Sequence, residues 1–355
     1  MGPRAYTRRG GIEQASPVPV TDLGEVRIRF LAPEEGALLA GAIRVAYGET
    51  YDAPWCYDAA EVGRRIAGGR FVACVAEAAD GTLLCHAGLS RHSRRDLVGH
   101  AGQAITVPAA RGHHLFTEVK RALARWGGSH GMAGMYSEAT AAHPYSERAN
   151  VELGAHETGF LLGWIPESVS NNAASAVLAG RQSAALFYLK MNPGHTRPVY
   201  VPPRHRDAVH QIIRVCGLRG RLAEPPSRLR LSSHSHVHTA VQADHNLAVL
   251  TAAEPGADLL PAVGAIRRRL FDRGIAALYL DLPLDNPATA QVAGHLEDLG
   301  VSFSGIFPNT RADGDVLRMQ SLNGITVTTD DVAVASDHGK ELLAYVLNDL
   351  VNSAA

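Results

Sequence analysis

The stretch from Gly102 to Gly163 limits the fold more than any other part of the chain, because strand-like and helix-like segments alternate along it. Apolar runs typical of strands are separated by segments with apolar residues on one helical face. The segments end at Pro108, at a glycine cluster and at Leu-Gly, which are typical stop signals. In order they span 103–107, 116–126, 133–140, 143–153 and 160–165. Strand, helix, strand, helix, strand predicts a mixed α/β fold built on a βαβ unit.

The turn between the first strand and the first helix reads Arg111-Gly112-His113-His114-Leu115. Backbone N–H groups at the start of a helix, together with the helix dipole, favour a bound phosphate. The Arg111 side chain adds a positive charge beside these groups. The turn therefore predicts an anion-binding site.

The order Val-Pro-x-x-Arg-Gly, helix, glycine cluster, acidic strand and short helix ending in Leu-Gly resembles the GNAT superfamily of acyl-CoA-dependent N-acyltransferases. The preceding segments extend the resemblance, since a strand, two helices and a hairpin are expected before the βαβ unit. These segments span 25–30, 33–46, 58–67, 70–77 and 83–89. With a last strand at 185–190, the resemblance covers about residues 25–192.

The resemblance implies acetyl-CoA or another acyl-CoA as co-substrate. In the family, the strand before the turn holds the acyl arm by its backbone, and the turn amides hold the pyrophosphate. Arg111 fits the first position of the family's turn motif, whereas the two motif glycines fall on His114 and Phe116. Ser146 is expected to cap a helix or contact the cofactor. The implied cofactor residues are Ile105, Thr106, Val107, Arg111, Gly112, His113, His114, Leu115 and Ser146.

Acyl transfer to an amine needs a neutral nucleophile, a stabilised carbonyl oxygen and a proton for the departing thiolate. The family stabilises the oxygen through a backbone N–H where the strand at 103–107 splays from its neighbour. A Glu on that strand often serves as base, but here Gln103 cannot accept the proton. Glu138 on the adjacent strand is therefore the candidate base or amine-binding group. The alternative is a structural carboxylate paired with a basic neighbour.

The family's general acid is a Tyr four residues before the helix-ending glycine, and this position is Asn150 here. His143 and Tyr145 are the alternative proton carriers, unless they only cap the helix and pack beneath the turn. An aromatic loop follows the first helix and is expected either to line the acceptor pocket or to cover a core. Its aromatic residues are Tyr47, Tyr51, Trp55 and Tyr57.

The chain also contains a weak internal repeat, since 134–144 and 277–287 share a tyrosine, an acid and a proline at constant spacing. We therefore expect two GNAT-like domains in tandem, at 23–192 and 193–355, after a disordered arm at 1–22. The second copy lacks the phosphate turn and carries Glu254 and Asp258 in that region. Because carboxylates repel pyrophosphate, this copy is expected to be degenerate, with a structural or acceptor-site role.

Composition limits the partners. The net charge of −1 argues against nucleic acid. The sequence has no apolar run long enough for a membrane span and no signal-peptide core, which favours a cytoplasmic location. His234, His236 and His238 share one strand face that has the geometry for Zn²⁺ or Ni²⁺, but exposed polar faces are common and no metal is expected.

These patterns predict an N-acyltransferase, expected to be an N-acetyltransferase, that acts on a small-molecule amine by direct transfer. The absent glycines leave open a different donor, such as a longer acyl or an aminoacyl thioester. A catalytically silent ligand-binding or assembly protein is the alternative from another class. A monomer with pseudo-two-fold tandem domains and a homodimer are both compatible with the repeat.

Overall fold

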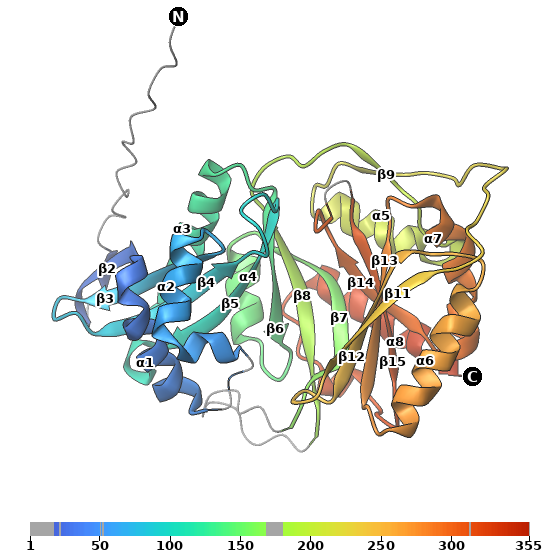
Figure 1. Cartoon of the computed structure of the whole chain (residues 1–355). Helices are drawn as coiled ribbons and strands as arrows, with labels where there is room; N and C mark the ends of the chain where they lie inside the picture. Colours follow the sequence, from blue (N-terminus) through green and yellow to red (C-terminus); the bar gives the residue numbers. More distant parts are fainter. Residues whose placement is uncertain are drawn as a thin grey trace, which may run out of the picture.

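A computed structural model describes residues 18–20, 23–49, 51, 53–167, 180–311 and 314–354. Thirteen strands of this described part form one mixed sheet in the order β1-β2-β3-β4-β5-β6-β8-β7-β14-β15-β13-β12-β11. This is the mixed α/β architecture that the sequence predicts, with helices on both faces (Figure 1). The strands are β1 (Val18–Val20), β2 (Gly24–Phe30), β3 (Phe71–Ala78), β4 (Leu83–Ser90), β5 (Val98–Thr106), β6 (Gly134–Thr140), β7 (His156–Ile165), β8 (Gln182–Lys190), β11 (His236–Gln242), β12 (Leu247–Glu254), β13 (Ala277–Pro283), β14 (Ser302–Phe307) and β15 (Val316–Leu322).

A separate parallel pair joins β9 (Arg197–Val199) to β10 (Gly220–Leu222). The helices are α1 (Gly36–Tyr47), α2 (Ala59–Ala67), α3 (Leu115–Ser129), α4 (Tyr145–Glu152), α5 (Arg206–Val215), α6 (Leu259–Asp272), α7 (Pro287–Val292) and α8 (Asp337–Ala354). None of these described helices combines the length and apolar character that crossing a bilayer requires.

The first half of the chain has the order β2, α1, α2, β3, β4, β5, α3, β6, α4, β7, β8. This is the order that the sequence led us to expect between about residues 25 and 192. Side chains along β3 alternate between the two faces of the sheet, so they pack with a different set of residues on each face. Phe71 and Val75 pack with Leu39 and Ile43 of α1, whereas Cys74 packs with the cluster that α3 covers.

The two halves of the sheet meet where β7 pairs with β14, through Gly159 and Gly305. A Cβ atom on Gly159 would lie 2.4 Å from the Ser304 carbonyl oxygen and 2.6 Å from the Gly305 Cα. Only glycine fits so close a backbone approach. This contact makes the sheet continuous through the centre of the molecule (Figure 1).

Beyond this contact, the order is β11, β12, α6, β13, α7, β14, β15, α8. The strands β12-β13-β15-β14 lie in the same relative order as β5-β6-β8-β7 of the first half, with a helix in each corresponding connection. The helical segment after β13 consists of α7 followed by a 3₁₀ helix, η5 (Ala293–Leu299).

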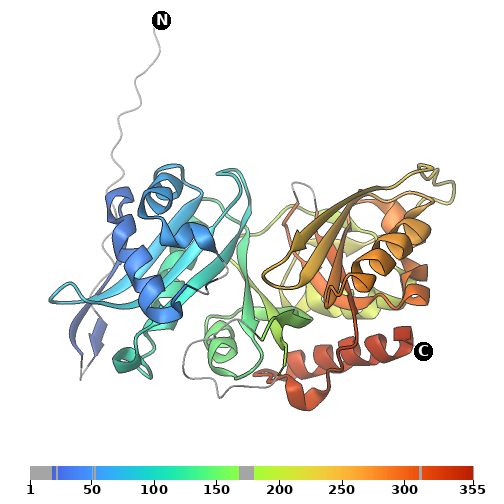
Figure 2. The same cartoon turned by 60° about the horizontal axis from the view of Figure 1, so that its bottom comes forward.

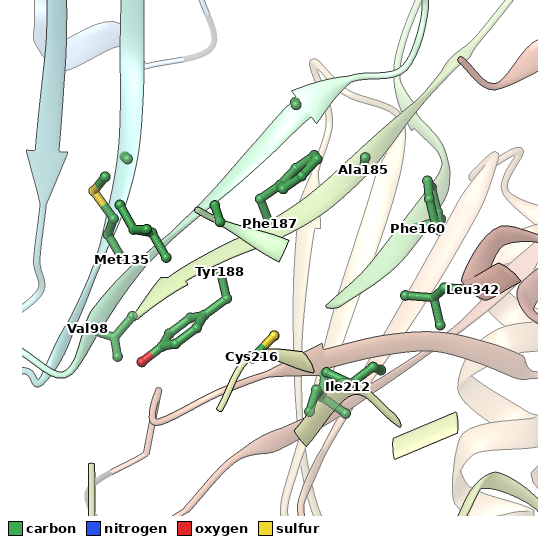
Figure 3. Close-up of a cluster of buried hydrophobic side chains, with 14 of the residues drawn as sticks. Val98, Met135, Phe160, Ala185, Phe187, Tyr188, Ile212, Cys216 and Leu342 are labelled. Atoms are coloured by element: carbon green, nitrogen blue, oxygen red, sulfur yellow. The ribbon is translucent and has the colours of Figure 1, made fainter. Parts of the chain in front are cut away.

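The C-terminal helix α8, which the sequence reading did not identify, packs against β7 and β14 (Figure 2). Its Asp349 Oδ2 accepts a 2.7 Å hydrogen bond from the Phe303 amide. Figure 3 shows Leu342 of α8 and Ile212 of α5 in the same apolar cluster as Phe160 of β7. The core therefore runs without interruption between the halves.

Two sequence expectations fall partly outside the described residues. Within the arm expected at 1–22, Val18–Val20 pairs antiparallel with β2 as strand β1, and the remaining residues up to position 22 lie outside the described part. The domain expected at 23–192 contains 168–179, which is also outside the described part, and its last strand, expected at 185–190, begins earlier, as β8 at Gln182.

Candidate active site

The parallel strands β5 and β6 diverge along their length. They pair from Val98 opposite Gly134 to His100 opposite Tyr136, and their later residues have no partner in each other. A cavity of about 670 Å³ opens between their ends, α1, the start of α3 and α4. It is lined by Tyr47, Ala104, Thr106, Ala110, Arg111, Gly112, His114, Leu115, Phe116, Thr117, Thr140, His143, Tyr145, Ser146, Arg148, Ala149 and Glu152.

A bulge in β5 begins this divergence. Gln103 has φ of 52°, which is uncommon for a residue other than glycine. The pairing with β4 shifts at the same place, since Gly88 lies opposite Gly102 but His86 lies opposite Ile105. The bulge reverses the side-chain alternation, because an extra residue on one strand exchanges its faces.

Three ring side chains hold the bulge. The Gln103 amide donates to Tyr51 Oη at 3.0 Å, and Tyr47 Oη donates to the Ala104 carbonyl oxygen. His86 Nδ1 lies 2.6 Å from the Gln103 carbonyl oxygen. Burial lowers the pKa of His86 to about 4, so its ring is neutral and Nδ1 carries the donated proton. These three side chains thus fix the backbone of the bulge.

The turn after β5 passes through a 3₁₀ helix, η3 (Pro108–Ala110), before α3 begins at Leu115. Gly112 has φ of 80°, and His114 has φ of 57° with ψ of 12°. A side chain in this left-handed region costs roughly 1–2 kcal/mol. His114 therefore adopts a conformation that glycine would take without cost, at one of the two positions where the family motif has glycine.

The cavity brings together most of the predicted cofactor and proton-carrying residues. The predicted residues that line it are Tyr47, Thr106, Arg111, Gly112, His114, Leu115, His143, Tyr145 and Ser146. His143 Nδ1 is buried and has no hydrogen-bond partner among the described residues. Tyr145 is 65% exposed, so it lies at the rim. Arg148, which the sequence reading did not select, adds a second cation to Arg111.

Other predicted residues lie outside the cavity lining. Ile105 is buried against the α1 core, and Val107 and His113 are half-buried. Trp55 packs edge-on against Phe71, with ring centroids 4.9 Å apart.

Tyr57 Oη accepts a hydrogen bond from the Tyr51 amide at 2.9 Å. The aromatic loop therefore divides into two parts. Tyr47 and Tyr51 reach the bulge, whereas Trp55 and Tyr57 cover the core beneath α1 and α2.

Lys120 lies buried beneath the turn, where the sequence gave no reason to expect a function. Its Nζ donates to Asn150 Oδ1 and lies 3.4 Å from Ser137 Oγ. Burial lowers the pKa of Lys120 to about 7. Asn150, which occupies the position of the family's general acid, is therefore a buried partner of this lysine.

Glu138 does not line the cavity but lies beside His100, with 2.6 Å between Glu138 Oε2 and His100 Nε2. Burial acts to raise the pKa of Glu138, but attraction to His100, its hydrogen bond and the Arg318 charge hold the pKa below its usual value. Glu138 is therefore an ionised carboxylate at neutral pH. The sequence analysis did not select His100, because the strand expected at 103–107 begins after this residue.

The candidate metal-binding histidines pair separately with carboxylates. His234 Nδ1 lies 3.0 Å from Asp258 Oδ2, and His236 Nδ1 lies 3.1 Å from Glu254 Oε2. Across the part of the chain that the structure covers, no three His, Cys, Asp or Glu side chains converge on a point that could hold a metal ion.

No protein-family model matches the chain, and no curated protein matches it. Among solved structures, it is similar to spermidine/spermine N-acetyltransferase SpeG from Vibrio cholerae. The complex of that protein with manganese ions has 14% identity and a TM-score of 0.36, covering 47% of this chain and 92% of that one. The complex of spermidine N-acetyltransferase from the same organism with CoA and spermine has 13% identity and a TM-score of 0.36, covering 47% of this chain and 95% of that one. Similarity at this level assigns neither an activity nor a substrate.

Proposed function

We propose that the chain is a GNAT-fold N-acyltransferase that transfers an acyl group, expected to be acetyl, from acyl-CoA to a small-molecule amine. The observation that carries this proposal is a pair of left-handed residues beside one cavity: His114, which lines it, and Gln103, whose neighbour Ala104 lines it. Strained backbone that persists in a folded protein is concentrated at functional sites. The bulge in β5 and the turn before α3 therefore border the same cavity, which supports a site in which the turn binds an anion.

The donor lies in this proposal between β5 and β6, with its pyrophosphate at the turn. Arg111 and Arg148 neutralise phosphate charge, and the amides from Gly112 to Leu115 donate to phosphate oxygens. The acyl carbonyl lies at the bulge, where the amide of Ala104 is the candidate donor to the developing oxyanion.

The transfer is direct. The acceptor ammonium loses one proton to the Glu138–His100 pair, and its nitrogen attacks the thioester carbon. The C–N bond forms as the C–S bond breaks. The nitrogen then loses its second proton to solvent, and the thiolate takes a proton from His143 or Tyr145, which is replaced from solvent.

In this proposal residues 23–192 form the donor-binding domain, and residues 193–355 form a degenerate second copy. The shared strand order of the two halves supports the second copy. The corresponding turn before α6 carries Asp258 at the helix start, which repels phosphate.

A thermal-unfolding series with acetyl-, propionyl-, longer acyl- and free CoA tests donor binding. We expect at least one of them to raise the unfolding midpoint of the wild type by several degrees, because a ligand that binds only the native state stabilises it. Arg111→Glu should abolish this shift. Arg268→Glu, the same charge change on the exposed side of α6, should retain it. Absence of a shift with every CoA would refute the proposed donor.

One observation favours a silent ligand-binding protein as the second candidate. The position of the usual general acid is occupied by Asn150, which is engaged by Lys120. Such a protein would bind CoA in the assay above, yet would release no thiol from acyl-CoA with any amine. A thiol-release assay across an amine panel separates the two functions.

A further inference from the structure

A second cluster of polar and aromatic side chains spans the contact between the halves. We call it the cross-half cluster, and it comprises His100, Tyr136, Glu138, Asp281, Phe307 and Arg318. Tyr136 of β6 meets Phe307 of β14 edge-on, with ring centroids 5.2 Å apart. His100 stacks on Tyr136 at 5.1 Å. Strands that are separated by others in the sheet therefore bring their side chains together.

Arg318 of β15 lies at the centre of this cluster and is 8% exposed. Its Nε and Nη2 each donate a 2.7 Å hydrogen bond to Asp281, one to each carboxylate oxygen. Its Cζ lies 4.3 Å from the centre of the Phe307 ring. Asp281 and Phe307 thus fix the guanidinium, while Nη1 makes no hydrogen bond to any described residue. Because Nη1 is not among the described side-chain atoms that are both buried and unpaired, it remains accessible and can donate to an anionic ligand group.

Glu138 supplies the opposite charge on the first-half side of the cluster. Its side chain is 16% exposed and contacts His100, and it is near enough to Arg318 for their charges to attract. Two carboxylates and one guanidinium give the cluster a charge of −1 when His100 is neutral. An ammonium group beside Glu138 would pair with that carboxylate, while a ligand carboxylate would share Arg318 with Asp281, so a zwitterion leaves the charge of the cluster unchanged.

The cross-half cluster adjoins the cavity. Thr140, two residues beyond Glu138 on the same face of β6, lines the cavity. Two residues along a strand span roughly 7 Å. An amine held at Glu138 is therefore within the length of a small molecule of an acyl group between β5 and β6.

We propose that the cross-half cluster binds the acceptor, and that the acceptor is an amino acid whose ammonium contacts Glu138 and whose carboxylate contacts Arg318. This inference deepens the proposed function, on which it rests for the use of the bound amine in acyl transfer. In this inference the second half contributes side chains to the acceptor site, because Arg318 and Asp281 both lie in that half. The internal sequence repeat then has a chemical consequence, since its two aligned acids, Glu138 and Asp281, lie in one cluster.

Binding of the proteinogenic L-amino acids, tested singly on the full chain by calorimetry, examines this proposal. For the tightest ligand, the decarboxylated amine and the deaminated acid are compared with it. We expect each to bind at least ten-fold more weakly, since each lacks one of the two charged contacts. Glu138→Gln and Arg318→Lys should weaken amino-acid binding at least ten-fold.

Arg29→Lys is the matched control. Arg29 donates two hydrogen bonds to Glu77 in the same bidentate manner, but it lies on β2, and its side chain is 19% exposed against 10% for Arg318. This variant should bind the amino acid as the wild type does. Circular dichroism and the unfolding midpoint of each variant show whether it is folded. If Arg318→Lys does not fold, Asp281→Asn replaces it, with the same weakening expected because Arg318 loses its anchor.

The outcomes separate this inference from the proposed function. A CoA-dependent midpoint shift without binding of any amino acid, or with equal binding of the decarboxylated amine, would overturn the inference and leave the acyltransferase proposal standing. Amino-acid binding that depends on Glu138 and Arg318, without any CoA response, would support the acceptor site and overturn the acyltransferase proposal.

Discussion

Replacing the buried acid Glu147 with glutamine should remove a pH-dependent loss of stability from the protein. Glu147 lies in α4 and is fully buried, although its helix neighbours Ser146 and Arg148 line the cavity. Its Oε2 accepts a 2.9 Å hydrogen bond from the Ala335 amide, and Oε1 has no partner among the described residues. The pKa of Glu147 is raised from 4.5 to about 8, mainly by burial. The hydrogen bond from Ala335 lowers this pKa, and the charge of Glu157 raises it.

The direction of the effect follows from proton linkage. Because the folded-state pKa lies above the unfolded-state value, the native state keeps a proton that the unfolded chain releases. The contribution of Glu147 to stability is therefore full below about pH 4.5, and it is lost as the pH rises to about 8. At about 1.4 kcal/mol per pKa unit, the loss between pH 5 and pH 8 is about 3 kcal/mol.

Urea unfolding at a series of pH values measures this loss. The free energy of unfolding of the wild type should fall relative to Glu147→Gln by about 3 kcal/mol between pH 5 and pH 8. The glutamine keeps an acceptor for the Ala335 amide but cannot ionise. Glu341→Gln, an exposed substitution on α8, should follow the wild type. Parallel pH curves for wild type and Glu147→Gln would refute the argument, since they would mean that Glu147 ionises as readily in the native state as in the unfolded chain.

Three further substitutions test the backbone features of the site and of the contact between the halves. His114→Gly should raise the unfolding free energy by about 0.5–1 kcal/mol in denaturant titration while retaining CoA binding, because glycine relieves the left-handed strain; a loss of stability would contradict this. Gly159→Ala should lower the free energy of unfolding by about 3 kcal/mol, because the added methyl group clashes with backbone atoms. Gly41→Ala, in open space on α1, should not lower it. Tyr51→Phe leaves the Gln103 amide without its acceptor. Acyl-transfer turnover should therefore fall at least ten-fold, while CoA affinity should change less than three-fold. An unchanged turnover would exclude a role of Tyr51 in holding the bulge for catalysis.

The elements of the first half could be predicted because their signals are local. Apolar periodicity, Pro108 and the Leu-Gly stop identify α3, β6 and α4 within a few residues of their bounds, whereas β5 begins at Val98, well before the strand expected at 103–107. The helix α8 also has a local apolar pattern, with Leu342, Leu343 and Val346 buried. Its omission was a failure to apply the same periodicity to the end of the chain.

The shape of the candidate site could not be predicted in the same way, because it depends on contacts between distant residues. Gln103 and Tyr51 are 52 positions apart, and neither residue type specifies a bulge. The His100–Glu138 contact requires the parallel register of β5 and β6, which a single sequence does not fix. The left-handed His114 is contrary to the residue's own preference, so only the surrounding structure can impose it.

The second half contacts the first at two places, one at α4 and one at Glu138. At the first place, the segment before α8 holds α4, since the Ala335 amide binds Glu147 and Ser336 Oγ donates to Glu157 at 2.8 Å. At the second, Arg318 attracts Glu138 and thereby lowers the pKa of that carboxyl. The first contact holds α4, whose residues line the cavity, and the second helps to keep Glu138 ionised. Under the proposed function, the second half can perform both tasks without a phosphate turn, because neither requires it to bind a cofactor.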